Sequence, residues 1–318
     1  MDEKNKTQEI LEKLDIGLTE LFGSEAYKKY LDTMSKFSSY SFNNTLLIAM
    51  QNPDATLVAG YEDWNKKFNR QVQKGEKGIY IIAPAPYKKE IEKEELNPIT
   101  GNIEIIREEI VIPSYKATAV FDISQTKGEP LPKLGVDELT GEVKDWGKLK
   151  AILTDISPVP ISYEKIANGS KGFYSHTDKK IVIKEGMDPV QELKTSIHEV
   201  AHALLHDKDG VVIEGVEDVE LNSKTKEVQA ESIAYAVCQH LGIDTSEYSF
   251  GYIAGWSSGK DKKELRDSME TIRKTTNYLI YKIEKSLAET KKLEEEKTKE
   301  LKEEKVTQKK SKAKKKIS

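Results

Sequence analysis

The spacing of apolar residues divides the chain into a helical start, a strand-rich middle and a second mixed region. Within residues 1–22, Leu11, Leu14, Leu18 and Leu21 recur at steps of three and four residues, which predicts an amphipathic helix. The same spacing, with Gly23-Ser24 and Asn52-Pro53 as breaks, predicts three further helices at Glu25–Phe37, Ser41–Asn52 and Tyr61–Phe68.

The period then changes from that of a helix to that of a strand. β-branched and aromatic residues predict an antiparallel meander at Ile79–Ala83, Ile103–Ile112 and Ser114–Ile123. The charged insert Lys88–Glu95 and the turn Pro98–Gly101 are expected to form a hairpin excursion. A Gly- and Pro-containing segment, Lys127–Pro132, reads as a linker. We therefore expect a first domain over residues 1–130 and a linker over residues 131–143.

Residues 144–287 are expected to form a second domain. Its pattern predicts helices at Lys144–Thr154, from Asp188-Pro189 to beyond Leu204, and at Lys226–Leu241, with strands at Gly172–Ser175 and Ile181–Lys184. From Lys260, apolar residues alternate at four- and three-residue steps, which is typical of a helical seam. The Lys/Glu-rich tail, residues 288–318, is expected to be a solvated helix or disordered. The fold class is thus α+β, in two domains.

Composition restricts the expected cellular location of the protein but does not indicate its function. The 318 residues carry a net charge of −4, so any nucleic-acid-binding surface must be local. Cys238 is the single cysteine, which fits a reducing compartment. The N-terminus lacks the features of a signal peptide, and no apolar run approaches the length of a membrane span. A cytoplasmic protein is expected.

The strongest chemical signal is His198-Glu199-Val200-Ala201-His202. Histidines four apart lie on one face of a helix, one turn from each other, and can bind one tetrahedral zinc ion. Glu199 lies beside them and is the expected general base of this HExxH arrangement. Ordinary surface histidines on a helix are the alternative interpretation.

A catalytic zinc needs a third protein ligand, and the next predicted helix offers two. Glu227 and Glu231 lie four apart, so one can bind the metal while the other orients a histidine. We favour Glu227 as the ligand. His206, one turn beyond His202, is expected either near the metal site or as a residue that caps the helix end. His176 and His240 are expected at the surface, and Cys238 in the core.

Several separated segments resemble the ArdC-type antirestriction proteins of mobile elements, in order over about Glu25 to Lys285. In the first domain these segments are Ser41–Leu47, Gly60–Trp64, Lys74–Gly78 and Ala119–Thr126. In the second they are His198–His202, Glu227–Glu231, Leu241–Ile243 and Tyr252–Trp256, and Gly172–Tyr174 also resembles the broader ImmA/IrrE group. The Lys88–Gly101 insert and the Lys/Glu tail depart from the family pattern.

The resemblance implies an N-terminal single-stranded-DNA-binding domain joined to a zincin-like metallopeptidase domain. It places Zn²⁺ on His198, His202 and Glu227, with Glu199 as general base. Five cations and one aromatic ring in the first domain could bind DNA. They are Lys66, Lys67, Arg70, Lys74 and Lys77, and Trp64. Since Tyr61, Trp64 and Phe68 have helical spacing, their rings could equally be core.

The resulting expectation is a protein of a conjugative or integrative element that protects entering single-stranded DNA from restriction. Its partners would be single-stranded DNA and a protein or peptide substrate, with no membrane. Alternatives are an ImmA-like zinc peptidase that cleaves a repressor, and a non-enzymatic DNA-protecting protein with structural zinc. Zinc-dependent nuclease action is a weaker third alternative.

Overall fold

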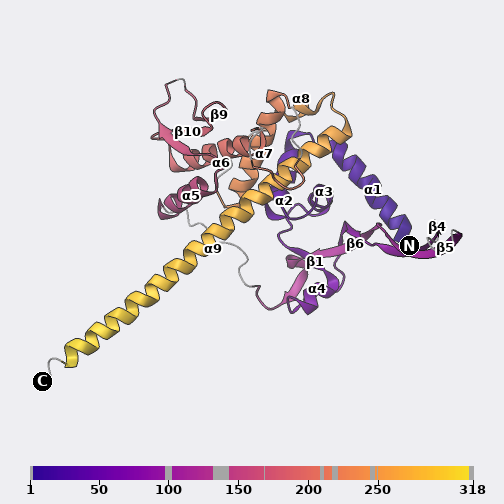
Figure 1. Cartoon of the computed structure of the whole chain (residues 1–318), viewed down its shortest axis with the longest axis horizontal. Helices are drawn as coiled ribbons and strands as arrows, with labels where there is room; N and C mark the ends of the chain where they lie inside the picture. The colour runs from indigo at the N-terminus through magenta and orange to yellow at the C-terminus, as the bar shows by residue number, and fades with distance from the viewer. Residues whose placement is uncertain are drawn as a thin grey trace. The chain divides into compact units, whose positions relative to one another are not determined.

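A computed structural model of the chain describes residues 3–96, 102–131, 143–167, 169–207, 211–216, 221–243, 248 and 250–314, and Figure 1 labels many of its elements. The chain divides into two compact units, Met1–Pro130 and Leu131–Ser318. Both units combine helices with sheets, so the α+β class expected from the sequence is confirmed. Most of the expected linker, residues 132–142, lies outside the described residues. No helix within the described ranges is both long and apolar enough to cross a membrane.

The helices of unit 1 form where the apolar spacing predicts them. They are α1 (Glu3–Glu20), α2 (Ser24–Lys36), α3 (Phe42–Gln51) and α4 (Tyr61–Lys66). Ser41 caps α3, because its hydroxyl accepts a hydrogen bond from the Asn44 backbone N–H. Leu14 and Leu18 are buried together with Ile10, whereas Leu11, which we expected on the same side, is 45% exposed.

A small antiparallel sheet packs on these helices. Its strand order is β1 (Val58–Gly60), β6 (Tyr115–Asp122) and β3 (Ile79–Pro84). The residue that caps the end of α2, a residue of α3 and residues of all three strands share one buried core, which comprises Phe37, Ile48, Ala55, Val58, Ile79, Ile81 and Val120. The core therefore joins the predicted helices to the predicted sheet.

Helix α3 also satisfies the outer edge of strand β3. The Asn44 side-chain amide donates to the Ile82 carbonyl at 2.9 Å and accepts from the Ile82 N–H at 2.8 Å. The Gln51 amide makes the same pair of bonds to Tyr80, at 2.8 and 2.9 Å. Backbone groups that a further strand would normally pair are thus bonded to side chains.

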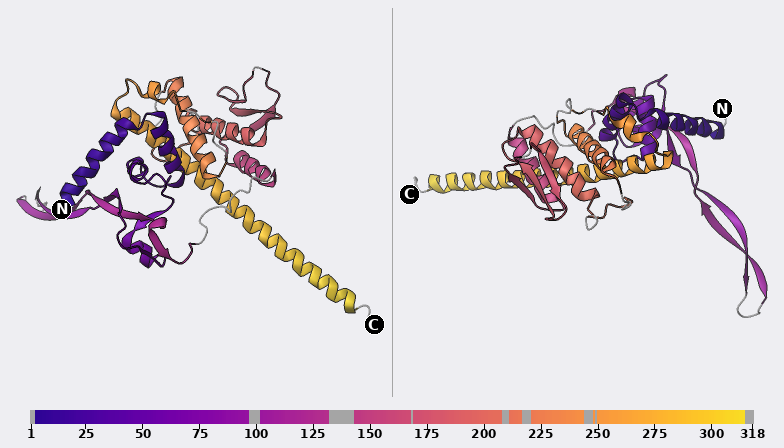
Figure 2. Two further views of the ribbon diagram at one scale, coloured as in Figure 1. Left: turned by 180° about the vertical axis from the view of Figure 1, so that it is seen from behind. Right: turned by 90° about the horizontal axis from the view of Figure 1, so that it is seen from above.

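The expected three-strand meander is wrong in one respect. Strand β3 pairs directly with β6, while β5 (Ile103–Ile112) pairs antiparallel with β4 (Tyr87–Leu96) in a separate two-stranded ribbon. This ribbon projects from the rest of unit 1 (Figure 2). Charged side chains occupy both of its faces, so neither face can join an apolar core. The Lys88–Glu95 excursion is therefore longer than predicted, and its turn at 97–101 lies outside the described residues.

The pattern of apolar residues did not predict the strands that have only three residues. Strand β2 (Arg70–Val72) pairs antiparallel with β7 (Thr126–Gly128). Lys127 and Gly128, at the end of the expected first domain, were read as the start of a linker segment, and they instead form part of a strand. Strands this short carry too few residues for a two-residue period to be recognised.

Unit 2 has a mixed three-stranded sheet beside its helices. Strand β10 (Lys180–Lys184) lies in the middle, parallel to β8 (Ile161–Glu164) and antiparallel to β9 (Gly172–Ser175). The helices are α5 (Val143–Ile156), α6 (Pro189–Leu205), α7 (Ser223–His240), α8 (Ile253–Ser257) and α9 (Lys262–Lys314). Helix α6 packs against β9, β10, α5 and α7, and α7 packs against α9.

Helix α9 extends well beyond the residues through which it packs in the core of unit 2. Its first turns bury the seam predicted from Lys260, including Met269, Ile272, Leu279 and Ile283. The helix then continues to Lys314, through a tail for which the sequence left helix and disorder open. The distal part of α9 runs clear of the rest of unit 2 (Figure 1).

Candidate metal centre

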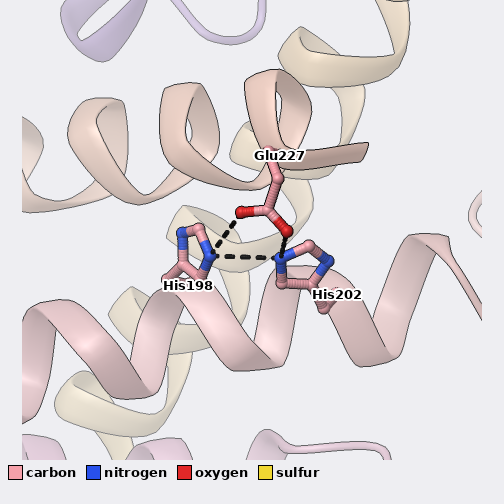
Figure 3. Close-up of side chains that lie close together, drawn as sticks. All are labelled: His198, His202 and Glu227. Atoms are coloured by element: carbon pink, nitrogen blue, oxygen red, sulfur yellow. Dashed lines mark hydrogen bonds and ion pairs between the residues drawn. The ribbon is translucent and has the colours of Figure 1, made fainter. Parts of the chain in front are cut away.

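The HExxH residues lie on a helix whose start is well defined by the sequence. The Asp188 side chain accepts the Val190 N–H at 2.9 Å, and Pro189 occupies the first helical position, where its missing N–H costs nothing. Leu193, Ile197 and Ala201 are buried along one side of α6. This packing leaves His198 and His202 on the side that faces α7 (Figure 3).

The structure brings His198, His202 and Glu227 together. The two Nε2 atoms are 3.1 Å apart, and the Glu227 carboxylate oxygens lie 3.5 Å from His198 Nε2 and 3.4 Å from His202 Nε2 (Figure 3). Among the described residues, these three form a group whose ligand atoms all lie within 4.8 Å of one another. Two imidazole nitrogens and one carboxylate suit zinc, and three protein ligands leave a fourth position open.

The carboxylate of Glu227 is held as an anion. Hydrogen bonds from His198 and His202 lower its pKa far below the usual range, against a smaller effect of burial. Burial alone would lower the pKa of His198, but Glu227, Glu199 and Glu231 outweigh it, so the pKa is raised. The cluster is thus rich in negative charge, which favours a cation.

Glu199 lies in a drier environment than Glu227. It is 7% exposed, and burial raises the pKa of its carboxyl group, although His198 and His202 oppose the shift. The backbone N–H of Tyr174, on strand β9, donates to this carboxylate. A carboxylate with a raised pKa, fixed beside a metal-ligand cluster, is suited to accept and return a proton.

Glu231 is not in the group formed by His198, His202 and Glu227, and it has a different partner. Tyr252 donates its hydroxyl proton to this carboxylate. Burial raises the pKa of Glu231, while the Tyr252 bond lowers it. Glu231 nevertheless borders the same hollow as His198 and Glu199. The alternative in which Glu231 provides the ligand atom has no support in this arrangement.

The remaining histidines take three different roles. His206 ends α6 and is 7% exposed, with its ring 2.9 Å from that of His202, and burial lowers its pKa to about 4. His176 is exposed, as expected, and its ring packs against that of Tyr174. His240 was expected at the surface but is half-buried, because it joins α7 to Glu284 of α9 at 2.9 Å.

Cys238 is no nucleophile in this environment. The side chain is fully buried, and burial raises the pKa of its thiol to about 12. The expectation that it belongs to the core is confirmed.

Two hollows adjoin the metal-ligand cluster. One, of about 540 Å³, reaches from Gly172 and Lys194 to His198 and Glu231. The other, of about 490 Å³, extends along His202, His206 and Lys226. Glu199 borders both, so a substrate that lies across the cluster would pass this carboxylate.

The DNA-binding candidates of unit 1 separate into structural and exposed residues. Trp64 is fully buried and donates from Nε1 to the Phe121 carbonyl at 2.8 Å, so it cannot stack on a base; that expectation is corrected. Arg70 bonds Thr126 and the carbonyls of Gly128 and Glu129, which pins β2 to β7. Trp64 and Arg70 were candidates for DNA contact because of their residue type, but their hydrogen bonds in the structure give both a structural role.

The four lysines are all exposed. Lys66, the last residue of α4, and Lys67, which follows it, form ion pairs with Glu62 and Asp63. Lys74 and Lys77 lie in the turn between β2 and β3. The Gln125 side chain holds this turn by donating to the Lys77 carbonyl at 2.9 Å. Tyr61, whose helical spacing allowed a place in the core, is instead 63% exposed at the start of α4.

Fold and site define a two-unit α+β protein with an HExxH helix and a facing glutamate in its second unit. Residues 3–121 match the family model described as the N-terminal domain of anti-restriction factor ArdC. Unit 1 is therefore similar to the ArdC N-terminal domain, which confirms the resemblance drawn from the sequence.

Other similar proteins span different parts of the chain. An uncharacterized protein of Bacillus anthracis is 30% identical over 328 residues, covering 90% of this chain but 52% of that protein. The chain thus spans about half the length of this curated relative. Metal-free and Mn(II)-bound crystal structures of the antirestriction ArdC protein from plasmid R388 are each 18% identical, with TM-scores of 0.44 and 0.45. They cover 79% and 78% of this chain and 86% and 85% of theirs.

Proposed function

We propose that unit 2 is a zinc-dependent peptidase whose ligands are His198, His202 and Glu227. The observation that carries the proposal is the convergence of their three ligand atoms within 4.8 Å, with Glu199 next to His198 on the same helix. The donor set fits zinc because imidazole and carboxylate are its usual ligands at catalytic sites. Bound there, zinc would supply Lewis-acid chemistry to a peptide carbonyl and an adjacent water.

Residues of the chain account for the remaining steps. Glu199 removes a proton from the water that attacks the carbonyl carbon, and returns it to the amine nitrogen as the C–N bond breaks. The Tyr174 N–H keeps this carboxylate oriented. Strand β9 is one of the two outer strands of its sheet, so an extended peptide could pair along it, beside His198, His202 and Glu227.

The first test compares Glu199→Gln with Glu192→Gln on the same helix. We expect Glu199→Gln to lower hydrolysis of an unstructured protein such as casein by about 10²- to 10⁴-fold while zinc binding is kept. Glu192, which pairs with Lys150 at the start of α6, should be replaceable without effect. Both variants are assayed for hydrolysis and, by calorimetry, for zinc affinity.

Three results would oppose the peptidase proposal. If wild-type protein binds zinc but Glu199→Gln cleaves as well as wild type, Glu199 is not the base. If wild type binds zinc and cleaves neither casein nor a nucleic acid, structural zinc is the better description. Cleavage of nucleic acid instead of casein would support the nuclease alternative.

We further propose that unit 1 binds single-stranded DNA. The match of residues 3–121 to the ArdC N-terminal domain supports this, together with the exposed pair Lys74 and Lys77. Lysine contacts to phosphate supply affinity without sequence preference, and an exposed ring such as Tyr61 can stack on a base. In this proposal the protein acts in the cytoplasm and protects entering single strands from restriction.

The DNA proposal predicts a measurable salt dependence. Each phosphate contact on a single strand makes the slope of log binding constant against log salt concentration more negative by about 0.7. Lys74→Ala/Lys77→Ala removes two contacts and should therefore make the slope shallower by about 1.4. Binding of a fluorescent single-stranded oligonucleotide is measured across a salt series, with the matching duplex for comparison. Lys262→Ala/Lys263→Ala, an exposed pair in unit 2, is the matched control.

An unchanged slope in the Lys74/Lys77 variant would remove these residues from the DNA surface. No binding of any single strand at low salt would contradict the DNA-binding function itself. A protein-recognising first unit would then be favoured, as in an ImmA-like regulator that cleaves a repressor.

A further inference from the structure

Lysines from two elements border the hollow of about 540 Å³ beside His198. Lys194 lies on α6 and is 5% exposed, whereas Lys171 directly precedes β9 and is exposed. Lys194 precedes His198 by four residues, so about 6 Å along the helix axis separate the two positions. Positive side chains thus lie close to the proposed metal site, in a part of the hollow that the proposed reaction does not use.

A neutral side chain holds Lys171 at this hollow. Lys171 Nζ donates to Gln191 Oε1 at 2.7 Å, and Gln191 Nε2 donates to the Thr195 hydroxyl at 3.2 Å. Gln191 and Thr195 border the same hollow. Because an amide oxygen is uncharged, it does not neutralise Lys171. An ammonium group has three N–H donors, so Lys171 can donate two further hydrogen bonds.

Other lysines around the same sheet and helix form ion pairs with carboxylates. These pairs are Lys150–Glu192, Lys179–Asp207 and Lys180–Glu164. Within the described part of the chain, Lys171 forms no ion pair. A positive charge that is held beside a hollow without a counter-ion favours a negatively charged ligand there.

Two carboxylates also border the hollow, and both have donors within the chain. Glu199 accepts a backbone N–H of β9, and Glu231 accepts the Tyr252 hydroxyl proton. Both interact electrostatically with His198. Gln191, in contrast, precedes His198 by seven residues, which is about 10 Å along α6. The negative charge of the hollow therefore lies near the metal ligands, and the exposed lysine is held further along the helix.

We propose that this hollow is a substrate subsite that binds an acidic side chain, with Lys171 as its main contact. The inference rests on the proposed peptidase function and names the substrate class of that site. An extended peptide advances about 3.4 Å per residue, so a distance of about 6 to 10 Å along α6 corresponds to two or three residues. The preferred substrate therefore carries Asp or Glu within about three residues of the cleaved bond, on the side that enters this hollow.

Fluorogenic peptides that differ at one position test the subsite. The parent sequence surrounds a bond that wild type cleaves in casein, and each position within three residues of this bond is replaced in turn by Glu, Gln or Lys. On one side of the bond, we expect kcat/KM to be about 10-fold higher for Glu than for Gln, because an ammonium group binds a carboxylate more strongly than an amide.

Variants of Lys171 link the preference to this side chain. Lys171→Glu should remove the preference for Glu and favour Lys at the same positions, whereas Lys171→Arg should keep the preference for Glu. Since Lys171 is exposed, neither change disturbs the core. Lys165→Glu makes the same charge reversal at an exposed position outside both hollows, and is the matched control.

A binding measurement tests the subsite without any hydrolysis. ¹⁵N-labelled Glu199→Gln protein, loaded with zinc, is titrated with an alanine- and glycine-based peptide that has either a central Glu-Glu pair or a central Gln-Gln pair. NMR shift changes give the Kd of each peptide. We expect the Glu-Glu peptide to bind about 10-fold more tightly, and the difference to disappear when Lys171→Glu is added.

The outcomes separate this inference from the peptidase proposal. If wild type cleaves peptides but does not distinguish Glu from Gln at any position, the inference is overturned and the peptidase function stands. A preference for Glu that survives Lys171→Glu would also overturn it. If wild type cleaves no peptide, the peptidase proposal fails, and the titration alone decides on the subsite. Equal Kd values for the two peptides would then overturn the subsite as well.

Discussion

At the scale of single residues, Asp122 organises much of unit 1. Its buried carboxylate accepts the backbone N–H groups of Thr56, Leu57 and Ser124 at 2.7 to 3.0 Å. Burial alone would raise the pKa of Asp122, but these three donors together lower it below the ordinary value. One side chain thus joins the end of β6 to the loop before β1.

The sign of this shift predicts a pH dependence of stability. Because the folded pKa is depressed, Asp122 stabilises the protein above its unfolded pKa of 3.8, and this contribution is lost as pH falls through the folded pKa. Asp122→Asn should lower the free energy of unfolding of unit 1 by about 2 kcal/mol at pH 7. The difference from wild type should shrink below about pH 4.

Urea unfolding of the full chain can follow Trp64 once Trp146 and Trp256 are replaced by phenylalanine. Trp64 reports on this region, since its indole donates to the Phe121 carbonyl next to Asp122. A deficit of Asp122→Asn that stayed constant from pH 7 to pH 3 would contradict the assigned role.

Residue identity alone could not settle which carboxylate faces the histidines. Glu227 and Glu231 share one face of α7, and the sequence favoured Glu227 without excluding the other. The packing of α7 against α6 places Glu227 beside the Nε2 atoms of His198 and His202, and Glu231 beside Tyr252. Trp64 and Arg70 were ambiguous for a similar reason, since a ring or a guanidinium serves a core or a surface equally well.

At the scale of elements, the contact between β9 and α6 depends on a glycine. A Cβ at Gly172 would lie 2.7 Å from Thr195 Cγ2 of α6 and 3.1 Å from both Ile183 Cδ1 and the Val182 carbonyl oxygen. This close approach brings the Tyr174 N–H to Glu199. The hydrogen bond from Tyr174 to Glu199 therefore depends on the short distance between β9 and α6.

Gly172→Ala should separate β9 from α6. We expect a loss of about 1–3 kcal/mol in stability, together with lower hydrolytic activity as Glu199 loses its backbone donor. Gly147→Ala is the matched control, because nothing lies within 4 Å of its added Cβ and α5 should become slightly more stable. Thermal unfolding and the casein assay measure both. Equal melting temperatures for wild type and Gly172→Ala would contradict the close approach.

Long periodic elements could be predicted from the sequence, and short or unpaired ones could not. Helices α1, α2, α3 and α6 follow the apolar spacing and its caps. Strands β1, β2 and β7 have three residues each, and their existence depends on partners far along the chain. The pairing of β5 with β4 instead of the central sheet is likewise a long-range choice.

At the scale of the whole molecule, the proposed DNA contacts and the proposed metal site belong to different units. The Lys74–Lys77 turn lies in unit 1 and the histidine cluster in unit 2. The sequence indicated this division because each set of motifs occupies a continuous part of the chain. Since the chain spans about half of its Bacillus anthracis relative, the activities of that longer protein need not coincide with those proposed for these two units.

The four hydrogen bonds that the side-chain amides of Asn44 and Gln51 make along β3 affect how the protein can assemble. Asn44 and Gln51 already occupy Tyr80 and Ile82, so an incoming strand must displace four hydrogen bonds before it gains any. Strand swapping and fibril-like stacking through β3 are thereby disfavoured. In a protein proposed to recruit extended peptides at β9, this arrangement prevents the sheet of unit 1 from competing for the same strands at that edge.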